Sequence, residues 1–90
     1  MSACVIGHIT VKDPDKWSEY RSKVPPTLAQ WGGEVIFRGR RVKVFCGELP
    51  YVDTVVIRFP DAGSASGWYD SASYRALIPL REQAADIILV

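Results

Sequence analysis

His8 is the single histidine of the chain and the residue best suited to proton transfer. Histidine is the side-chain type whose unperturbed pKa lies near neutrality, so it is the usual acid or base in proteins near pH 7. Strand-like alternation puts His8 on one face with Cys4, Ile6 and Thr10. A histidine within a strand is also commonly a hydrogen-bonded structural residue. The sequence therefore leaves a catalytic and a structural interpretation of His8 open.

Arginines gather at residues 38–41, where the sequence is Arg-Gly-Arg-Arg. Arg40 and Arg41 are typical of a solvated turn. Arg38 follows the apolar Ile36 in a period-two pattern, so we expect it on a partly buried face. A half-buried guanidinium needs an anion, which it can hold with two parallel hydrogen bonds. We therefore expect Arg38 to bind a carboxylate, either of the protein or of a ligand.

Aromatic residues are dense at a predicted corner between two helices, where Trp68, Tyr69 and Tyr74 lie close in sequence. Aromatic residues at this spacing mostly belong to a core. The alternative is a pocket wall whose phenol groups donate hydrogen bonds to a small organic ligand. Arg81 follows on the apolar stripe of the second helix, where an isolated charge is costly. For Arg81 we expect a structural salt bridge with a carboxylate.

Several familiar chemistries are missing from the sequence. It has no glycine-rich phosphate loop and no GxSxG or Cys/His protease pattern, which argues against nucleotide chemistry and covalent hydrolysis. A lone histidine and two separated cysteines, Cys4 and Cys46, make a poor transition-metal site. We therefore predict no metal and no other cofactor.

Composition predicts one globular domain over residues 1–90, because 48% of the residues are apolar and 23% are charged. The formal net charge is +1 without a basic patch, so we expect no nucleic-acid or membrane partner. No apolar run approaches the roughly 18 residues of a membrane span. The cysteines lack CxxC spacing and no export signal precedes them. We expect a cytoplasmic protein with reduced thiols, Cys46 being buried at a strand end.

Periodicity predicts the elements that position these side chains. Residues 4–11 alternate and are rich in β-branched types, which indicates a first strand. Asp13 as N-cap and Pro14 at the first helical position predict a helix that ends at Gly32-Gly33. Pro25-Pro26 is expected to kink or restart that helix. The apolar stripe of the helix comprises Trp17, Tyr20, Val24, Leu28 and Trp31.

Period-two alternation returns between Glu34 and Phe59. Gly39-Arg40 is either a bulge that bends one long strand or a hairpin turn, and we favour the bulge. Pro79 is expected to kink the last helix. The predicted elements are strands over 34–38, 41–46 and 53–59, helices over 60–69 and 73–85, and a last strand over 86–90.

The order β-α-β-β-α-β is the split βαβ pattern of a ferredoxin-like α+β sandwich, an antiparallel sheet with helices on one face. The strands are apolar on both sides, since Val55 and Ile57 point one way and Val56 the other, and Ile87 opposes Ile88. A second apolar face cannot stay in water. Two such sheets packed face to face would bury it, so we predict a homodimer.

A set of short motifs runs in fixed order through nearly the whole chain: Ile6-Gly7-His8, Asp13-Pro14, Tyr20, Pro26, Gly32-Gly33, Arg38-Gly39, Val55-Val56-Ile57-Arg58-Phe59-Pro60, Tyr69-Asp70-Ser71, Tyr74 and Pro79-Leu80-Arg81. Together they resemble domain-of-unknown-function family 1330, stand-alone bacterial proteins of the dimeric α+β-barrel superfamily. The resemblance implies a ferredoxin-like subunit that pairs through its sheet into a barrel. Members usually have Pro-Glu at Ala72-Ser73 and a small residue at Arg40, so the chain departs from the pattern there. Relatives in the superfamily look like cofactor-independent monooxygenases, isomerases and dehalogenases acting on small, often aromatic compounds.

We thus expect a homodimer with one pocket per subunit for a small anionic or aromatic organic molecule. If it is an enzyme, we expect cofactor-independent proton transfer, of isomerase or monooxygenase type, with His8 as acid or base and Arg38 holding a carboxylate or oxyanion. The alternative is a non-enzymatic ligand-binding or stress-related dimer. The expected pocket residues are His8, Tyr20, Arg38, Tyr69 and Tyr74.

Overall fold

In the computed structural model, which describes residues 2–90, one strand and one helix precede two strands, three short helices and a last strand. This order confirms the predicted ferredoxin-like α+β class. The elements are β1 (Ala3–Val11), α1 (Pro14–Ala29), β2 (Glu34–Arg40), β3 (Asp53–Phe59), α2 (Ala62–Asp70), α3 (Ala72–Arg75), α4 (Ile78–Ala84) and β4 (Ala85–Leu89).

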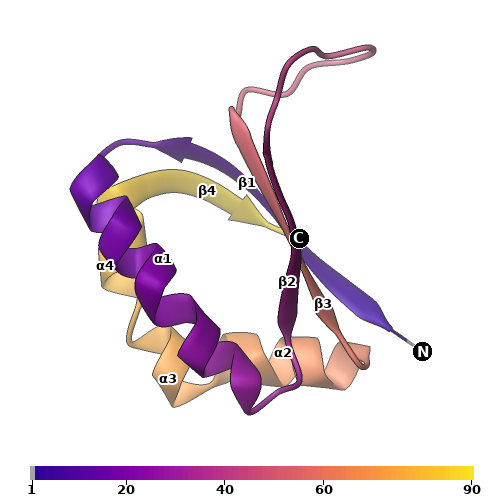
Figure 1. The fold of residues 1–90 in the computed structure, drawn as a ribbon, viewed down its shortest axis with the longest axis vertical. Coiled ribbons are helices and arrows are strands. Elements are labelled where there is room, and N and C mark those ends of the chain that lie inside the picture. Colours follow the sequence, from indigo (N-terminus) through magenta and orange to yellow (C-terminus); the bar gives the residue numbers. More distant parts are fainter. Residues whose placement is uncertain (1) are drawn as a thin grey trace.

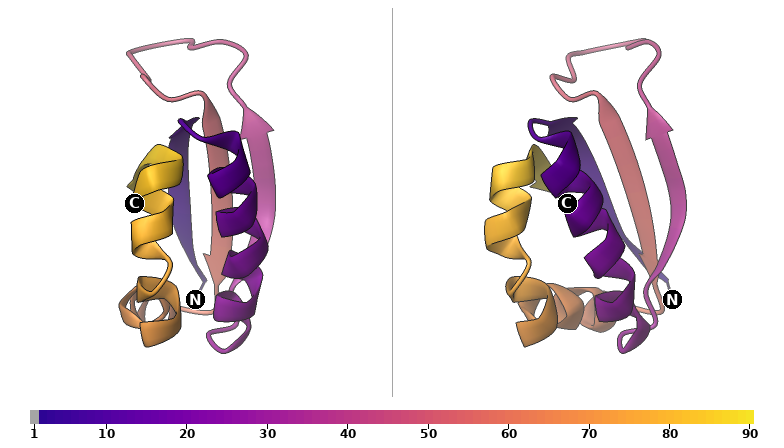
Figure 2. Two further views of the ribbon diagram at one scale, coloured as in Figure 1. Left: turned by 90° about the vertical axis from the view of Figure 1, so that its left-hand side faces the viewer. Right: turned by 60° about the vertical axis from the view of Figure 1, so that its left-hand side comes forward.

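The sheet has the order β2-β3-β1-β4, and every neighbouring pair is antiparallel. The helices lie on one side of the sheet and leave its other side open (Figure 1). Figure 2 shows α1 and α4 side by side across the covered face. We call the two sides the helix face and the open face. Alternation decides which side chains each face receives.

The helix α1 runs unbroken through Pro25 and Pro26, so the predicted kink or restart does not divide it into two helices. The Asp13 carboxylate accepts a hydrogen bond from the Lys16 backbone N–H at 3.1 Å, as the N-cap prediction requires. Gly32 has φ of 68°, a left-handed conformation that costs glycine little and turns the chain into β2.

The second half of the helical layer is more broken than the sequence indicated. Asp61 caps α2 by accepting from the Ser64 N–H at 2.7 Å, so this helix lies close to the predicted range of residues 60–69. The single helix predicted over 73–85 is wrong, because it is divided into α3 and α4, with Pro79 in the first turn of α4. Proline is favourable there since its missing N–H has no helical partner. Within residues 2–90 no helix is both long and apolar enough to cross a bilayer.

The β2 region corrects two predictions. The irregularity lies between Val35 and Phe37, which makes Ile36 the extra residue, whereas Gly39 pairs regularly with Thr54. Gly39-Arg40 is therefore neither a bulge nor a hairpin turn. A Cβ at Gly39 would lie 2.6 Å from Phe37 Cζ, so glycine is what lets that ring fold over the strand.

The predicted strand over residues 41–46 is a loop, and residues 41–52 project beyond the sheet (Figure 1). Arg40 already pairs with Asp53, the first residue of β3. The Arg41 N–H still donates to the Val52 carbonyl at 2.7 Å, but residues 42–46 have no partner strand, and alternation without a partner does not make a sheet. Val42 and Phe45 are 98% and 90% exposed in this loop.

The core lies between the helices and the helix face. Its four largest fully buried side chains are Ile9, Phe59, Trp68 and Tyr74. The Trp68 indole N–H donates to the buried Thr27 hydroxyl at 2.9 Å, so α2 is tied to α1 by a polar contact within the core. The ring of Trp68 packs on Tyr74 with centroids 4.2 Å apart, which positions Tyr74 from the α2 side.

Candidate functional site

Tyr20, Tyr74 and Arg81 form a hydrogen-bonded chain beneath the helices. The Tyr20 and Tyr74 hydroxyls are 2.8 Å apart, and Arg81 Nη1 donates to the Tyr74 hydroxyl at 3.0 Å. Tyr20 comes from α1, Tyr74 from α3 and Arg81 from α4, so three helices converge on this point. Both tyrosines belong to the core. We call these three residues the donor cluster.

The donor cluster holds more donors than acceptors. The guanidinium of Arg81 can only donate, whereas each phenol brings one O–H and accepting lone pairs. Arg81 uses one N–H on Tyr74, and its Nε is buried without a partner. No carboxylate within residues 2–90 forms an ion pair with Arg81, so the salt bridge predicted for it is wrong. The cluster is thus a positive group of donors that lacks an anionic acceptor.

The protonation states of Tyr20 and Arg81 decide what each can do in the cluster. Burial raises the pKa of Tyr20 far above its ordinary value, and Tyr74 raises it further. Tyr20 therefore stays a neutral O–H donor near pH 7. Burial lowers the pKa of Arg81, but the hydroxyls of Tyr74 and Tyr69 outweigh burial and leave it above its ordinary value. Arg81 keeps its positive charge.

A cavity of about 540 Å³ adjoins the cluster between α2, α4 and the strands β1 and β4. Arg81 and Tyr69 line it from the helical layer, and Ile87 and Leu89 line it from the sheet. Tyr69 and Tyr74 have ring centroids 5.5 Å apart, so Tyr69 extends the phenol surface from the buried cluster to the cavity. The cavity can hold a small molecule with an apolar body and an acidic group near Arg81.

Arg38 lies on the helix face but in a different hollow. The bulge at Ile36 puts Arg38 opposite Val55, whose side chain is buried under the helices. Arg38 is exposed overall, more so than the sequence indicated. Burial of part of its side chain lowers the pKa of Arg38, and the nearby charge of Arg21 lowers it further. Arg38 therefore lies near Arg21, and it also lines a small inner cavity of about 20 Å³ together with Tyr20 of the donor cluster.

His8 is separated from every other predicted site residue. Its neighbours Gly7 and Ile9 are buried on the helix face, so His8 itself projects from the open face. There its Nδ1 is 3.3 Å from the Thr54 hydroxyl, and its ring centroid is 6.5 Å from that of Tyr51. Within one chain, His8 therefore cannot reach the cavity beside Arg81.

Both cysteines are free and exposed. Cys46 lies in the loop after β2, so the prediction of a buried thiol at a strand end is wrong for the same reason that the strand itself is absent.

Sequence reasoning placed His8, Tyr20, Arg38, Tyr69 and Tyr74 in one pocket. The structure brings the three tyrosines together around Arg81 and places Arg38 near Tyr20, whereas His8 lies on the opposite face of the sheet. The prediction missed Arg81 as a site residue and treated it as a structural ion. The sequence did contain a signal for Arg81, because a positive charge on the apolar stripe of a helix is unusual. The prediction also missed Arg21, which carried no signal because an arginine on an exposed helix surface is ordinary.

Comparisons with known structures point to one fold. A protein of the DABB family with a ferredoxin-like fold from Mesorhizobium loti has a TM-score of 0.72 at 12% identity, with 99% of this chain and 92% of that chain covered. A dimeric ferredoxin-like protein of unknown function from Thermobifida fusca has a TM-score of 0.65 at 19% identity, with 100% and 88% covered. SnoaB, a cofactor-independent oxygenase from Streptomyces nogalater, has a TM-score of 0.71 at 7% identity, with 99% and 88% covered.

At such low identities these likenesses establish the ferredoxin-like fold and no activity. No curated protein sequence matches the chain. A family model, by contrast, matches residues 2–90, nearly the full length. The chain therefore belongs to the family described as Domain of unknown function (DUF1330).

Proposed function

We propose that this protein binds a small organic anion in the cavity beside Arg81. The observation that carries the proposal is the half-buried guanidinium of Arg81, which contacts a phenol and no carboxylate. A buried charge without a counter-charge is costly, and a ligand carboxylate or enolate would supply the missing acceptor. The apolar wall formed by Ile87 and Leu89 suits a hydrocarbon or aromatic body.

The proposal includes a homodimer joined through the open face. Exposed apolar side chains gather on this face, with Phe37 at 55%, Ile88 at 42% and Val90 at 67% exposure. A monomer rarely leaves so many large apolar groups on one flat surface. The Thermobifida fusca relative of the same fold is described as dimeric. A second copy of the chain would cover this face by sheet-to-sheet packing.

A second candidate function is cofactor-independent catalysis on the bound anion. It is favoured by the donor cluster, because Tyr20 and Tyr74 share one hydrogen bond and leave one phenolic proton for another acceptor. A neutral phenol and a guanidinium together stabilise a developing oxyanion. SnoaB, which shares the fold, is a cofactor-independent oxygenase. The role of His8 in proton transfer stays a prediction, and His8 would have to act at the dimer interface.

Binding is tested by titration with 4-hydroxybenzoate, a small aromatic carboxylate, followed by calorimetry. We expect saturable binding to the wild type. Arg81→Gln removes the charge and should weaken binding by about tenfold or more, since a charge-assisted hydrogen bond contributes roughly 1.5 to 3 kcal/mol. Tyr69→Phe keeps the ring and should weaken binding less. Mass spectrometry of small molecules that co-purify with the native protein would identify the natural ligand class.

Arg58→Gln is the matched control, because Arg58 pairs with Glu34 at 3.1 Å and lies on the open face. It should bind 4-hydroxybenzoate as the wild type does. Equal losses in the two arginine variants would show a general charge effect and contradict the proposal. If Arg81→Gln fails to fold, Tyr69→Phe still decides, because unchanged affinity in that variant would place the ligand elsewhere.

A further inference from the structure

Two adjoining hollows lie where α1 passes over β2 and the neighbouring strands, and both are lined by Arg21 and Arg38. The outer hollow has a volume of about 470 Å³ and the inner hollow about 250 Å³. The other outer residues are Ser18, Ser22, Pro25 and Val35, and the other inner residues are Ile9, Trp17, Gly39, Asp53 and Thr54. Arg21 and Arg38 thus line both hollows, and we call them the arginine pair.

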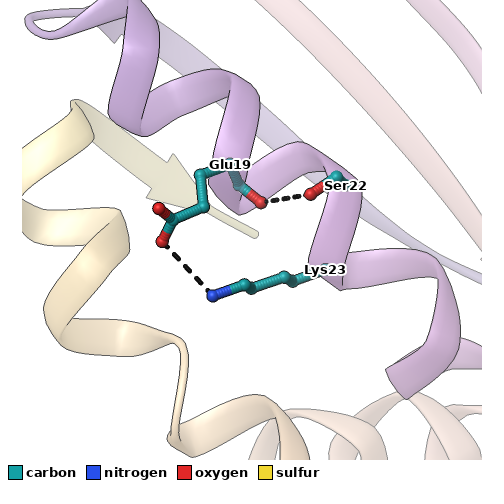
Figure 3. Close-up of polar contacts among 3 residues, drawn as sticks. All are labelled: Glu19, Ser22 and Lys23. Atoms are coloured by element: carbon teal, nitrogen blue, oxygen red, sulfur yellow. Dashed lines mark hydrogen bonds and ion pairs between the residues drawn. The ribbon is translucent and has the colours of Figure 1, made fainter.

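Within residues 2–90 neither arginine of the pair forms an ion pair with a carboxylate. The acidic residues Glu19 and Asp53 contact other basic residues. Glu19 contacts Lys23 at 3.3 Å, and its backbone carbonyl accepts from the Ser22 hydroxyl at 2.7 Å (Figure 3). Residues 19 and 21 point to opposite sides of a helix, since they are two positions apart. Asp53 lines the inner hollow, but its carboxylate lies 3.5 Å from Arg40.

Holding two like charges together raises the free energy of the empty site. The effect is visible in Arg38, where burial and then the charge of Arg21 lower the pKa. A monoanion would neutralise one guanidinium, and a dianion would neutralise both. Guanidinium groups present forked donors that match the oxygens of a phosphate group.

We propose that the arginine pair binds the phosphate group of a small phosphate monoester. The outer hollow supplies the Ser18 hydroxyl as a further donor for the phosphate oxygens. The inner hollow supplies Ile9 and the Trp17 ring as an apolar wall for the organic part of the ester. The site is separate from the cavity beside Arg81 and stands on different residues.

Phenyl phosphate and inorganic phosphate are the probes, titrated in low-salt buffer and followed by calorimetry. We expect phenyl phosphate to bind saturably and more tightly than phosphate alone, because only the ester reaches the apolar wall. Arg21→Gln and Arg38→Gln should each weaken binding by about tenfold or more. Arg75→Gln is the control, since Arg75 is an exposed residue of α3 outside both hollows. It should leave the affinity unchanged.

The proposal fails if the wild type shows no saturable binding of either phosphate compound at millimolar concentrations. It also fails if Arg75→Gln loses as much affinity as the two pair variants, which would indicate non-specific charge attraction. Benzoate that binds at the arginine pair as tightly as phenyl phosphate would make it a carboxylate site and overturn the assignment to phosphate. Circular dichroism spectra and melting curves of each variant confirm that an affinity loss comes from a folded protein.

Discussion

The two faces of the single sheet carry opposite kinds of chemistry, although the same strands supply both. On the helix face, Ile9, Val55 and Phe59 are at most 6% exposed, and positive donors lie among them. On the open face, Ile88 and Phe37 are 42% and 55% exposed, and the imidazole of His8 lies beside the Thr54 hydroxyl. Successive side chains of a strand point to opposite faces of the sheet, so neighbouring residues differ in solvent exposure, in nearby charges and in the groups they contact.

The two faces also differ in what each one lacks within a single chain. The helix face already has its apolar cover, and what it lacks is an anion for Arg81. The open face has its hydrogen bonds within the sheet, and what it lacks is apolar cover. In the proposed function the helix face binds the ligand and the open face forms the dimer interface, and four experiments test that division.

The largest effect is expected from Trp68→Ala on the helix face. Trp68 is 1% exposed and packs on Phe59 and Tyr74, so its loss leaves a cavity and removes the hydrogen bond from its indole N–H to the Thr27 hydroxyl. We expect a loss of about 3 to 5 kcal/mol in the free energy of unfolding, measured by denaturant titration. Val42→Ala in the exposed loop is the control and should be neutral. A loss below about 1 kcal/mol for Trp68→Ala would show that this face is not the core.

A change of oligomeric state is expected from Ile88→Glu on the open face. A charge placed in the sheet-to-sheet interface must be desolvated, whereas in a monomer it lies in water. Light scattering coupled to size exclusion should report about twice the chain mass of 10.0 kDa for the wild type and the single-chain mass for the variant. A monomeric wild type at micromolar concentration would contradict the proposal that the chain dimerises through the open face.

An intermediate effect concerns alkaline pH. The raised pKa of Tyr20 means that the folded protein binds the phenolic proton more tightly than the unfolded chain. The stabilisation is complete below the ordinary value of 10.0 and is lost as the pH rises above it. We expect the melting temperature to fall above about pH 10, and Tyr20→Phe to reduce that fall.

Melting curves between about pH 8 and pH 11 measure this decline. Tyr51→Phe is the control, because Tyr51 lies beside His8 and not in the donor cluster. It should keep the wild-type decline. A Tyr20→Phe variant whose melting temperature falls as steeply as that of the wild type would contradict a buried, neutral Tyr20.

The smallest effect is expected from His8→Gln. The lost contact with Thr54 is a single part-buried hydrogen bond, worth about 1 kcal/mol. Affinity for 4-hydroxybenzoate should not change, because His8 lies on the face opposite the cavity. Any turnover that depends on His8 should disappear while binding persists. A large loss of affinity would instead show that the open face takes part in ligand binding, and would break the division between the two faces.

The sequence by itself determined the elements whose evidence is local. Asp13 caps its helix as the cap pattern predicted, and β1 and β3 follow the alternation of their residues. The order of residues along β3 and β4 likewise predicted that both faces of the sheet carry apolar side chains. These features depend on contacts within a few residues, which a linear pattern can report.

Only the tertiary structure decided the features that need a distant partner. Residues 41–46 alternate like a strand, but β3 begins too late to pair with them. Arg81 was expected to meet a carboxylate, and the packing of α3 and α4 gave it the Tyr74 hydroxyl. The bulge at Ile36 brought Arg38 to the helix face beside Arg21. Such outcomes depend on which distant segments come into contact in the fold, and local periodicity does not predict those contacts.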